Sequence, residues 1–150
     1  MKLLVLAIMS LVVTTSASAQ ERRSAIIHAG TDDEDHRKCG LNHAGVSAAV
    51  ASVMRRNGFQ IEQNLTKGIN VDVILTPVPI SGGCAVSIEV DFSFIRAVTS
   101  GWGDTYIAIV SVCRKTALLT GPIHSLQARI RERAIEFTEV CISEEEAARR

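Results

Sequence analysis

The alternation of apolar and polar side chains is strongest in the middle of the chain, between Cys84 and Cys113. In residues 84–94 every second side chain is apolar, and the positions between them are mostly polar. This period of two predicts a strand with one buried face. Residues 106–113 are apolar at nearly every position, which predicts a second strand with both faces covered or one face offered to a partner. Gly101 and Gly103 predict a turn between the two strands, so we expect an antiparallel hairpin.

A third strand is predicted just before the hairpin, over residues 69–78, where the same alternation recurs. Pro77 and Pro79 have no backbone N–H to donate to a neighbouring strand, which favours a position at the edge of the sheet. A turn at residues 81–83 then leads into the hairpin. Consecutive strands joined by short turns favour an antiparallel meander.

Two helical patterns flank these strands. Residues 41–57 carry an apolar stripe that ends at Asn57-Gly58, and residues 122–142 carry a longer stripe with spacings of three and four. The order helix, three strands, helix predicts an α+β fold. We expect a two-layer sandwich in which a three-stranded antiparallel meander packs against two antiparallel helices.

The four cysteines can pair in three ways. A hairpin register that places residue 94 opposite residue 103 also places Cys84 opposite Cys113, within reach of a disulfide. Two antiparallel helices would bring Cys39, before the first helix, close to Cys141 near the end of the second. We therefore expect the pairs Cys39–Cys141 and Cys84–Cys113.

The N-terminus carries the pattern of a secretory signal peptide. Lys2 precedes an apolar run over residues 3–13, and Ala17-Ser18-Ala19 matches a cleavage site. The run is too short to span a membrane. The predicted organisation is a signal peptide over residues 1–19, a polar and partly disordered leader over residues 20–38, and a single α+β domain over residues 39–150. Export places the mature chain in the periplasm or outside the cell, where disulfides persist.

Charge excludes one class of partner. The chain has 16 basic and 16 acidic side chains, and removal of the signal peptide takes away one lysine. A nearly neutral chain lacks the basic character of a general nucleic-acid-binding protein. We expect no nucleic-acid partner and no transmembrane segment in the mature chain.

Metal and cofactor sites are not expected. The acidic residues 32–35 lack the spacing and the central glycine of a calcium loop. His36, Cys39 and His43 would supply only three zinc ligands, and Cys39 is expected to be oxidised in an exported chain. The glycines 82 and 83 lack the following helix of a phosphate-binding loop.

No catalytic motif stands out in the sequence. His43 and His124 could act with a carboxylate, and Glu89 and Asp91 are the nearest candidates by pattern. Both carboxylates fall on the polar face of the first hairpin strand, where such residues are usually solvated. A small secreted hydrolase that uses a His/carboxylate pair therefore stays as the alternative function.

The function that the pattern favours is an exported, disulfide-stapled, non-enzymatic binding or interaction protein of the cell envelope. Trp102 lies between two glycines, where it either anchors an interface or folds back over the core. If Ile107 and Ile109 face the helices, the opposite face of that strand is an apolar strip. The candidate interface comprises Trp102, Tyr106, Val110 and Val112. The expected partner is another envelope protein, a small ligand or a second copy of the chain, unless the leader or residues 118–119 cover the strip.

Overall fold

Five strands form one mixed sheet in the order β2-β1-β3-β4-β5. The computed structural model describes residues 23–30, 33–63 and 68–148, so the expected signal peptide lies outside the described residues. The strands are β1 (Arg23–Ala29), β2 (Phe59–Ile61), β3 (Ile69–Ile80), β4 (Gly83–Thr99) and β5 (Thr105–Gly121). The helices are α1 (Glu34–Lys38), α2 (His43–Arg56) and α3 (Ile123–Ala148).

The expected three-stranded antiparallel meander is wrong, although the fold is α+β. The strands β3, β4 and β5 do form antiparallel neighbours. The strand β1, however, lies within the stretch predicted as a leader and pairs in parallel with both β2 and β3. Parallel partners come from distant parts of the chain, so no nearby turn in the sequence signals the pairing.

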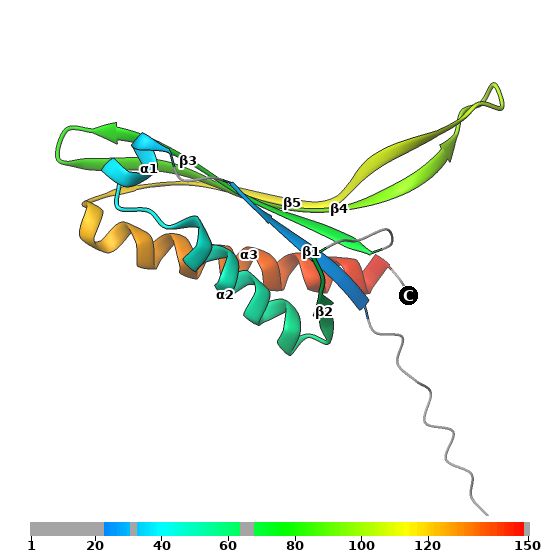
Figure 1. Cartoon of the computed structure of the whole chain (residues 1–150), viewed down its shortest axis with the longest axis horizontal. Coiled ribbons are helices and arrows are strands. Elements are labelled where there is room, and N and C mark those ends of the chain that lie inside the picture. Colours follow the sequence, from blue (N-terminus) through cyan, green and yellow to red (C-terminus); the bar gives the residue numbers. More distant parts are fainter. Residues whose placement is uncertain (1–22, 31–32, 64–67, 149–150) are drawn as a thin grey trace, which may run out of the picture.

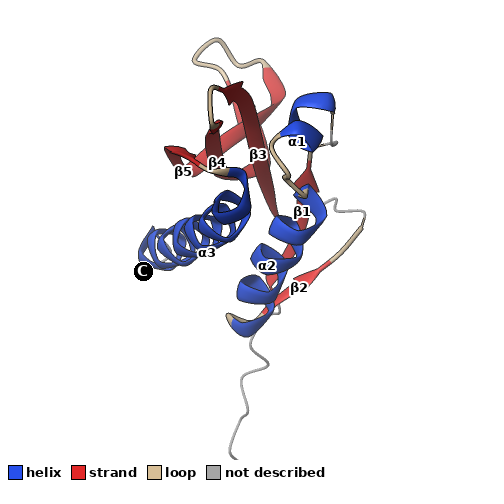
Figure 2. Cartoon of the chain, turned by 90° about the vertical axis from the view of Figure 1, so that its left-hand side faces the viewer, coloured by secondary structure: helices blue, strands red, loops and turns tan. Residues whose placement is uncertain are grey.

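The helices α2 and α3 pack on the same face of the sheet (Figures 1 and 2). The two helices run parallel, which corrects the antiparallel arrangement expected from the sequence. At their starts, the Asn42 backbone N–H donates to Gln127 Oε1 at 3.1 Å, and Arg56 at the end of α2 lies 4.0 Å from Glu139 in the second half of α3. The pairing of the strands explains this direction. Because β1 and β5 run the same way, helices that return from each of them along the sheet also run the same way.

The core lies between the sheet and these two helices. The period-two pattern of β4 corresponds to its buried row, and α3 contributes its apolar stripe. The buried residues of these two elements include Cys84, Val86, Ile88, Val90, Phe92, Leu126, Ile130 and Ala134. The alternation therefore identified the correct inner face for this part of β4.

The strand β3 is an edge strand only over its second half. Its pairing with β1 ends at Val73. Pro77 and Pro79 lie beyond this point, so their missing backbone N–H groups cost no hydrogen bond to β1. The helix α1 lies beside this open stretch, where His36 Nε2 is 3.1 Å from the carbonyl oxygen of Leu75. The expectation of an edge position was thus wrong for residues 69–73, which lie between β1 and β4.

All four cysteines form disulfides, but the pairing differs from the expected one. The bonds join Cys39 to Cys84 and Cys113 to Cys141. The hairpin register explains part of the difference, because Thr99 lies opposite Thr105 and Cys84 lies opposite Gly121. Residue 94 lies opposite residue 110 rather than residue 103. The parallel helices explain the rest, because they place the start of α2 beside the start of α3, far from Cys141.

Candidate interaction surface

The hairpin of β4 and β5 extends beyond the rest of the sheet. In the part of the chain that the structure describes, pairing between β3 and β4 begins at Ile69 and Phe94, so β4 has only β5 as a neighbour from Ile95 onward. We call residues 95–110 the arm. Figure 1 shows the arm projecting away from the helices as a two-stranded ribbon. None of the described helices covers either face of this ribbon.

An irregularity in β5 marks the base of the arm. Phe92 lies opposite Cys113 and Ser93 lies opposite Ser111, so Val112 is an extra residue without a partner on β4. A bulge of this kind bends its strand and increases the local twist. The bulge therefore lies where the hairpin leaves the sheet.

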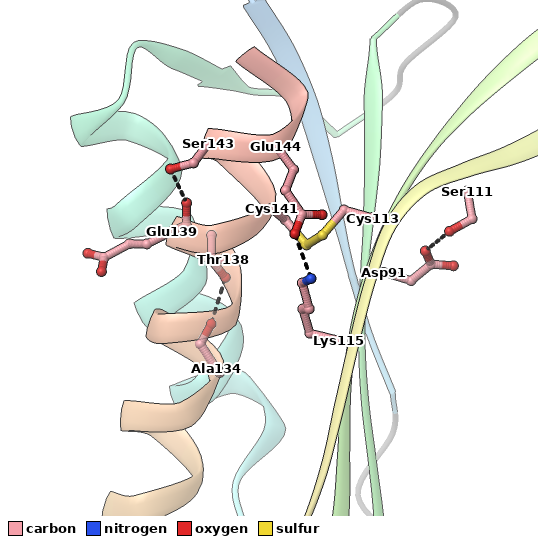
Figure 3. The surroundings of a disulfide bond; sticks show 10 residues. All are labelled: Asp91, Ser111, Cys113, Lys115, Ala134, Thr138, Glu139, Cys141, Ser143 and Glu144. Carbon is pink, nitrogen blue, oxygen red and sulfur yellow. Dashed lines mark hydrogen bonds and ion pairs between the residues drawn. A yellow bond between two sulfur atoms is a disulfide. The ribbon is translucent and has the colours of Figure 1, made fainter. Parts of the chain in front are cut away.

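Two contacts fix the base of the arm to α3 (Figure 3). The disulfide between Cys113 and Cys141 joins β5 to α3 directly after the bulge. Beside it, Lys115 Nζ lies 2.6 Å from Glu144 Oε1. The arm thus starts from a covalently anchored position, while its far end extends from the body of the molecule.

The turn at the tip holds its own shape. The Ser100 N–H donates to the Asp104 carbonyl at 2.7 Å, and the Gly103 N–H donates to the Ser100 carbonyl at 3.0 Å. Gly103 has a φ of 91°, which suits the left-handed position of a three-residue hairpin loop. The Trp102 side chain is 94 % exposed at this tip. Trp102 therefore does not fold back over the core, and its side chain is exposed at the tip of the hairpin.

The bulge also decides which side chains of the arm share a face. Opposed residues point to the same side, and Ile95 lies opposite Ile109 while Ala97 lies opposite Ile107. These isoleucines lie on the outer face, away from the helices, with exposures of 78 % for Ile107 and 74 % for Ile109. The expectation that they face the helices is wrong, because the extra residue at Val112 reverses the alternation between Cys113 and the arm.

The four sequence-predicted interface residues lie in the arm or at its base, and all are exposed. They are Trp102, Tyr106, Val110 and Val112. Tyr106 and Val110 lie opposite Val98 and Phe94, on the side of the sheet that carries the helices but beyond their reach. Ile95, Ile107 and Ile109 also belong to this exposed surface but are not among the sequence-predicted interface residues. A predicted turn centred on Trp102 would have given a longer hairpin, with these three isoleucines in its outer part.

Neither expected cover lies over the arm among the described residues. In the segment at residues 118–119, Leu118 is exposed and Leu119 is buried in the core near the opposite end of β5. The described part of the expected leader forms β1, on the other side of β3, and α1, beside the second half of β3. The arm itself carries only two charged residues, Arg96 and Asp104. Its surface is therefore apolar on both faces and nearly neutral.

The candidate catalytic carboxylates belong to an ion-pair network in which Asp91 is buried and Glu89 is partly exposed. The Arg114 guanidinium lies 2.8 Å from Asp91 and 3.4 Å from Glu89, and Ser111 also donates to Asp91. The hydrogen bond to Asp91, together with the charges of Asp91 and Glu89, raises the pKa of Arg114 above its ordinary value. These carboxylates lie on the outer face of the sheet, where Asp91 opposes Arg114 across the β4–β5 ladder.

The candidate catalytic histidines lie in the helix layer instead. His43 is buried, and its Nε2 lies 2.7 Å from Nε2 of the equally buried His36. Asp33 caps α1 and lies 2.6 Å from His36 Nδ1, and hydrogen bonds from the His36 backbone and ring lower the pKa of Asp33. His124 is exposed in the first turn of α3. The sheet therefore separates both candidate histidines, His43 and His124, from the candidate carboxylates Glu89 and Asp91.

A hollow between β5 and α3 does not contain these candidate residues. Its volume is about 230 Å³, and it is lined by Leu119, Arg129, Glu132, Arg133 and Glu136. Within residues 23–30, 33–63 and 68–148, no three His, Cys, Asp or Glu side chains are grouped so that they could hold a metal ion. Over the same residues, no helix is both long and apolar enough to cross a membrane.

Comparisons with known proteins give distant structural similarity alone. No protein-family model and no curated protein sequence matches the chain. PelC from Paraburkholderia phytofirmans, a dodecamer, superimposes with a TM-score of 0.41 and 16 % identity over 82 % of this chain and 87 % of that chain. A point variant of the same dodecamer gives the same TM-score and identity over 85 % of its own length. A minor lipoprotein from Acinetobacter baumannii gives a TM-score of 0.27 and 9 % identity, over 81 % of this chain and 87 % of that one.

Proposed function

We propose that the protein is a small exported binding protein of the cell envelope, that it is not an enzyme, and that it contacts a protein partner through the arm. The observation that carries the proposal is the arm itself, whose apolar side chains are exposed on both faces. Contiguous exposed apolar surface is unusual on a monomeric soluble protein and is typical of an interaction site.

The geometry of the arm suits recognition of a protein. Trp102 stands at the tip on a loop that its own backbone hydrogen bonds order. A preordered aromatic side chain loses little conformational freedom on binding, and tryptophan is among the residues most enriched at energetic hot spots. The isoleucines of the outer face extend the same surface along β5. The base is anchored to α3 by a disulfide, so the arm is presented in a defined direction.

Export is supported by two independent features of the chain. The first 19 residues have the pattern of a secretory signal peptide. The cysteines form two disulfides, and such bonds persist in oxidising compartments such as the periplasm. The hydrolase alternative has no comparable support, because the sheet separates the candidate histidines from the candidate carboxylates.

Affinity capture from the native envelope tests the proposal. The bait proteins are the wild type, Trp102→Ala and Val140→Ala, which trims an exposed apolar residue of α3 outside the arm. We expect the wild type and Val140→Ala to retain the same partner. The loss of a hot-spot tryptophan should weaken that capture by about tenfold or more.

Equal capture by all three proteins would place the contact elsewhere and refute the role of the arm. The non-enzymatic part has its own test, in which the purified protein is assayed against ester, peptide and glycoside substrates. Hydrolysis that His43→Ala abolishes would show that this part of the proposal is wrong.

A further inference from the structure

The two edges of the sheet differ in how well they are protected. Among the strands that the structure describes, β2 forms one edge and β5 forms the other. The edge strand β2 has three residues, whereas β5 has seventeen. An edge strand presents unpaired N–H and C=O groups that can pair with another chain, and natural proteins usually limit this with short strands, charges, prolines or bulges.

Only the inner half of β5 carries such protection. The bulge at Val112 interrupts the strand, and Arg114 and Lys115 follow it. The outer half, residues 105–111, contains no charged residue, no proline and no bulge. An unprotected and mostly apolar stretch of edge strand therefore lies along the arm.

The hydrogen bonds of the turn show which backbone groups point outward. Ser100 and Asp104 form a hydrogen-bonded pair at the tip. Hydrogen-bonded and non-hydrogen-bonded pairs alternate along an antiparallel ladder, so the pairs that contain Ile107 and Ile109 are of the second kind. The N–H and C=O groups of Ile107 and Ile109 consequently point away from β4, toward the open edge.

We propose that this edge pairs with the same edge of a second copy of the chain, antiparallel and centred on Ala108. The inference rests on the proposed function, because it names one partner of the arm. In this register Ile107 lies opposite Ile109 of the second copy, and Tyr106 lies opposite its Val110. Every pair between residues 106 and 110 is then apolar, and the two-fold arrangement uses one self-complementary surface.

The charges at the two ends of the segment favour a second copy in this direction. The acidic Asp104 precedes the segment, and the basic Arg114 and Lys115 follow it. Antiparallel pairing places the acidic end of each copy toward the basic end of the other. Parallel pairing would instead place like charges side by side, which is unfavourable.

Sedimentation equilibrium of the full exported chain tests the proposal. We expect the wild type to dimerise with increasing concentration. The variant Ile109→Pro removes an N–H that points to the open edge and leaves the ladder with β4 complete, so the dissociation constant should rise at least tenfold. The matched control Ile109→Val keeps the N–H and the β-branched side chain, and it should dimerise like the wild type.

A pair of double variants tests the register without a proline. Ile107→Lys with Ile109→Lys places like charges opposite each other and should abolish the dimer. Ile107→Lys with Ile109→Glu places opposite charges there and should restore it. Both positions are solvent-exposed in one copy, so circular dichroism should show the same fold for all variants.

A wild type that stays monomeric at every concentration would overturn this inference. A dimer that neither Ile109→Pro nor the double lysine variant weakens would overturn it as well. If the chain is strictly monomeric but captures a different envelope protein in a Trp102-dependent way, this inference fails and the proposed function still holds. A dimer without any such capture would instead support the inference and contradict the envelope partner.

Discussion

Phe92 and Phe94 are two residues apart on β4, close to the boundary between the core and the arm. Phe92 is fully buried opposite Cys113. Phe94 is only partly buried, and the Arg96 guanidinium lies 5.3 Å from the centre of its ring. The same side chain therefore contributes differently to folding at these two positions.

Replacing each phenylalanine by alanine measures that boundary. We expect Phe92→Ala to lower the free energy of unfolding by about 3–5 kcal/mol, because it leaves a cavity in the core. The matched change Phe94→Ala should cost less than about 2 kcal/mol, because less of its surface is removed from water on folding. Denaturant unfolding followed by circular dichroism measures both, and equal losses would contradict a core that ends at Phe92.

At the residue scale, we expect Asp33 to make the stability of the fold depend on pH. Its side chain accepts from the His36 backbone N–H at 2.9 Å and lies 2.6 Å from the His36 ring, and these contacts lower its pKa. A carboxyl group whose pKa is lower in the folded state stabilises the fold above its unfolded pKa. That contribution is lost as the pH falls below about 4 and through the folded pKa.

The variant Asp33→Asn tests this linkage, because asparagine can still cap α1 but cannot ionise. We expect the wild type to have the higher thermal midpoint from pH 5 to pH 7. The difference should shrink steadily below pH 4 and vanish in strong acid. A difference that stays constant over the whole pH range would contradict the role of the ionised carboxylate.

At the scale of single residues, the alternation in the sequence correctly identified the buried row of β4 but failed in the arm. The failure has one cause, the unpaired residue Val112. A bulge depends on how two strands align, so the pattern of either strand alone cannot reveal it. The exposed Ile107 and Ile109 were therefore assigned to the wrong face.

At the scale of elements, each disulfide joins parts that only the folded chain brings together. The cysteines 113 and 141 are 28 residues apart, and those at 39 and 84 are 45 residues apart. The first bond ties β5 to α3, and the second ties the segment after α1 to the start of β4. In a chain-entropy model, closing loops of these lengths stabilises the fold by about 3–4 kcal/mol each.

Removing one bond at a time tests these contributions. We expect Cys113→Ser with Cys141→Ser to lower the free energy of unfolding by about 2–4 kcal/mol, and Cys39→Ser with Cys84→Ser to have a similar or slightly larger effect. Urea titration of the oxidised variants measures both values. Mass mapping under non-reducing conditions provides the control, and bonds between Cys39 and Cys141 would contradict the pairing described above.

Most elements were predictable from the sequence, but their arrangement was not. Local periods identified α2, α3 and the antiparallel strands, because those signals depend on neighbouring residues. The strand β1 has no such signal, because the adjacent Ile26 and Ile27 interrupt the alternation of apolar and polar side chains, and no nearby turn signals its pairing with β2 and β3. Without β1 the direction of α2 was unconstrained, and the expected disulfide pairing depended on that direction.

At the scale of the whole molecule, the structure combines a covalently stapled body with an exposed arm. The body contains the sheet, the two long helices and both disulfides. The arm adds little to the core, and its apolar side chains stay exposed to solvent in the folded chain. This division is the basis of our proposal that the arm serves binding rather than stability.

Site-specific photocrosslinking in the native host tests that claim most directly. A photoreactive amino acid is placed at position 102 or 107 in the arm, or at position 140 on α3 as an exposed control. Our account predicts that illumination links the two arm positions to a protein, either a second copy or another envelope protein, and leaves position 140 unlinked. Crosslinks from position 140 together with none from positions 102 and 107 would contradict it.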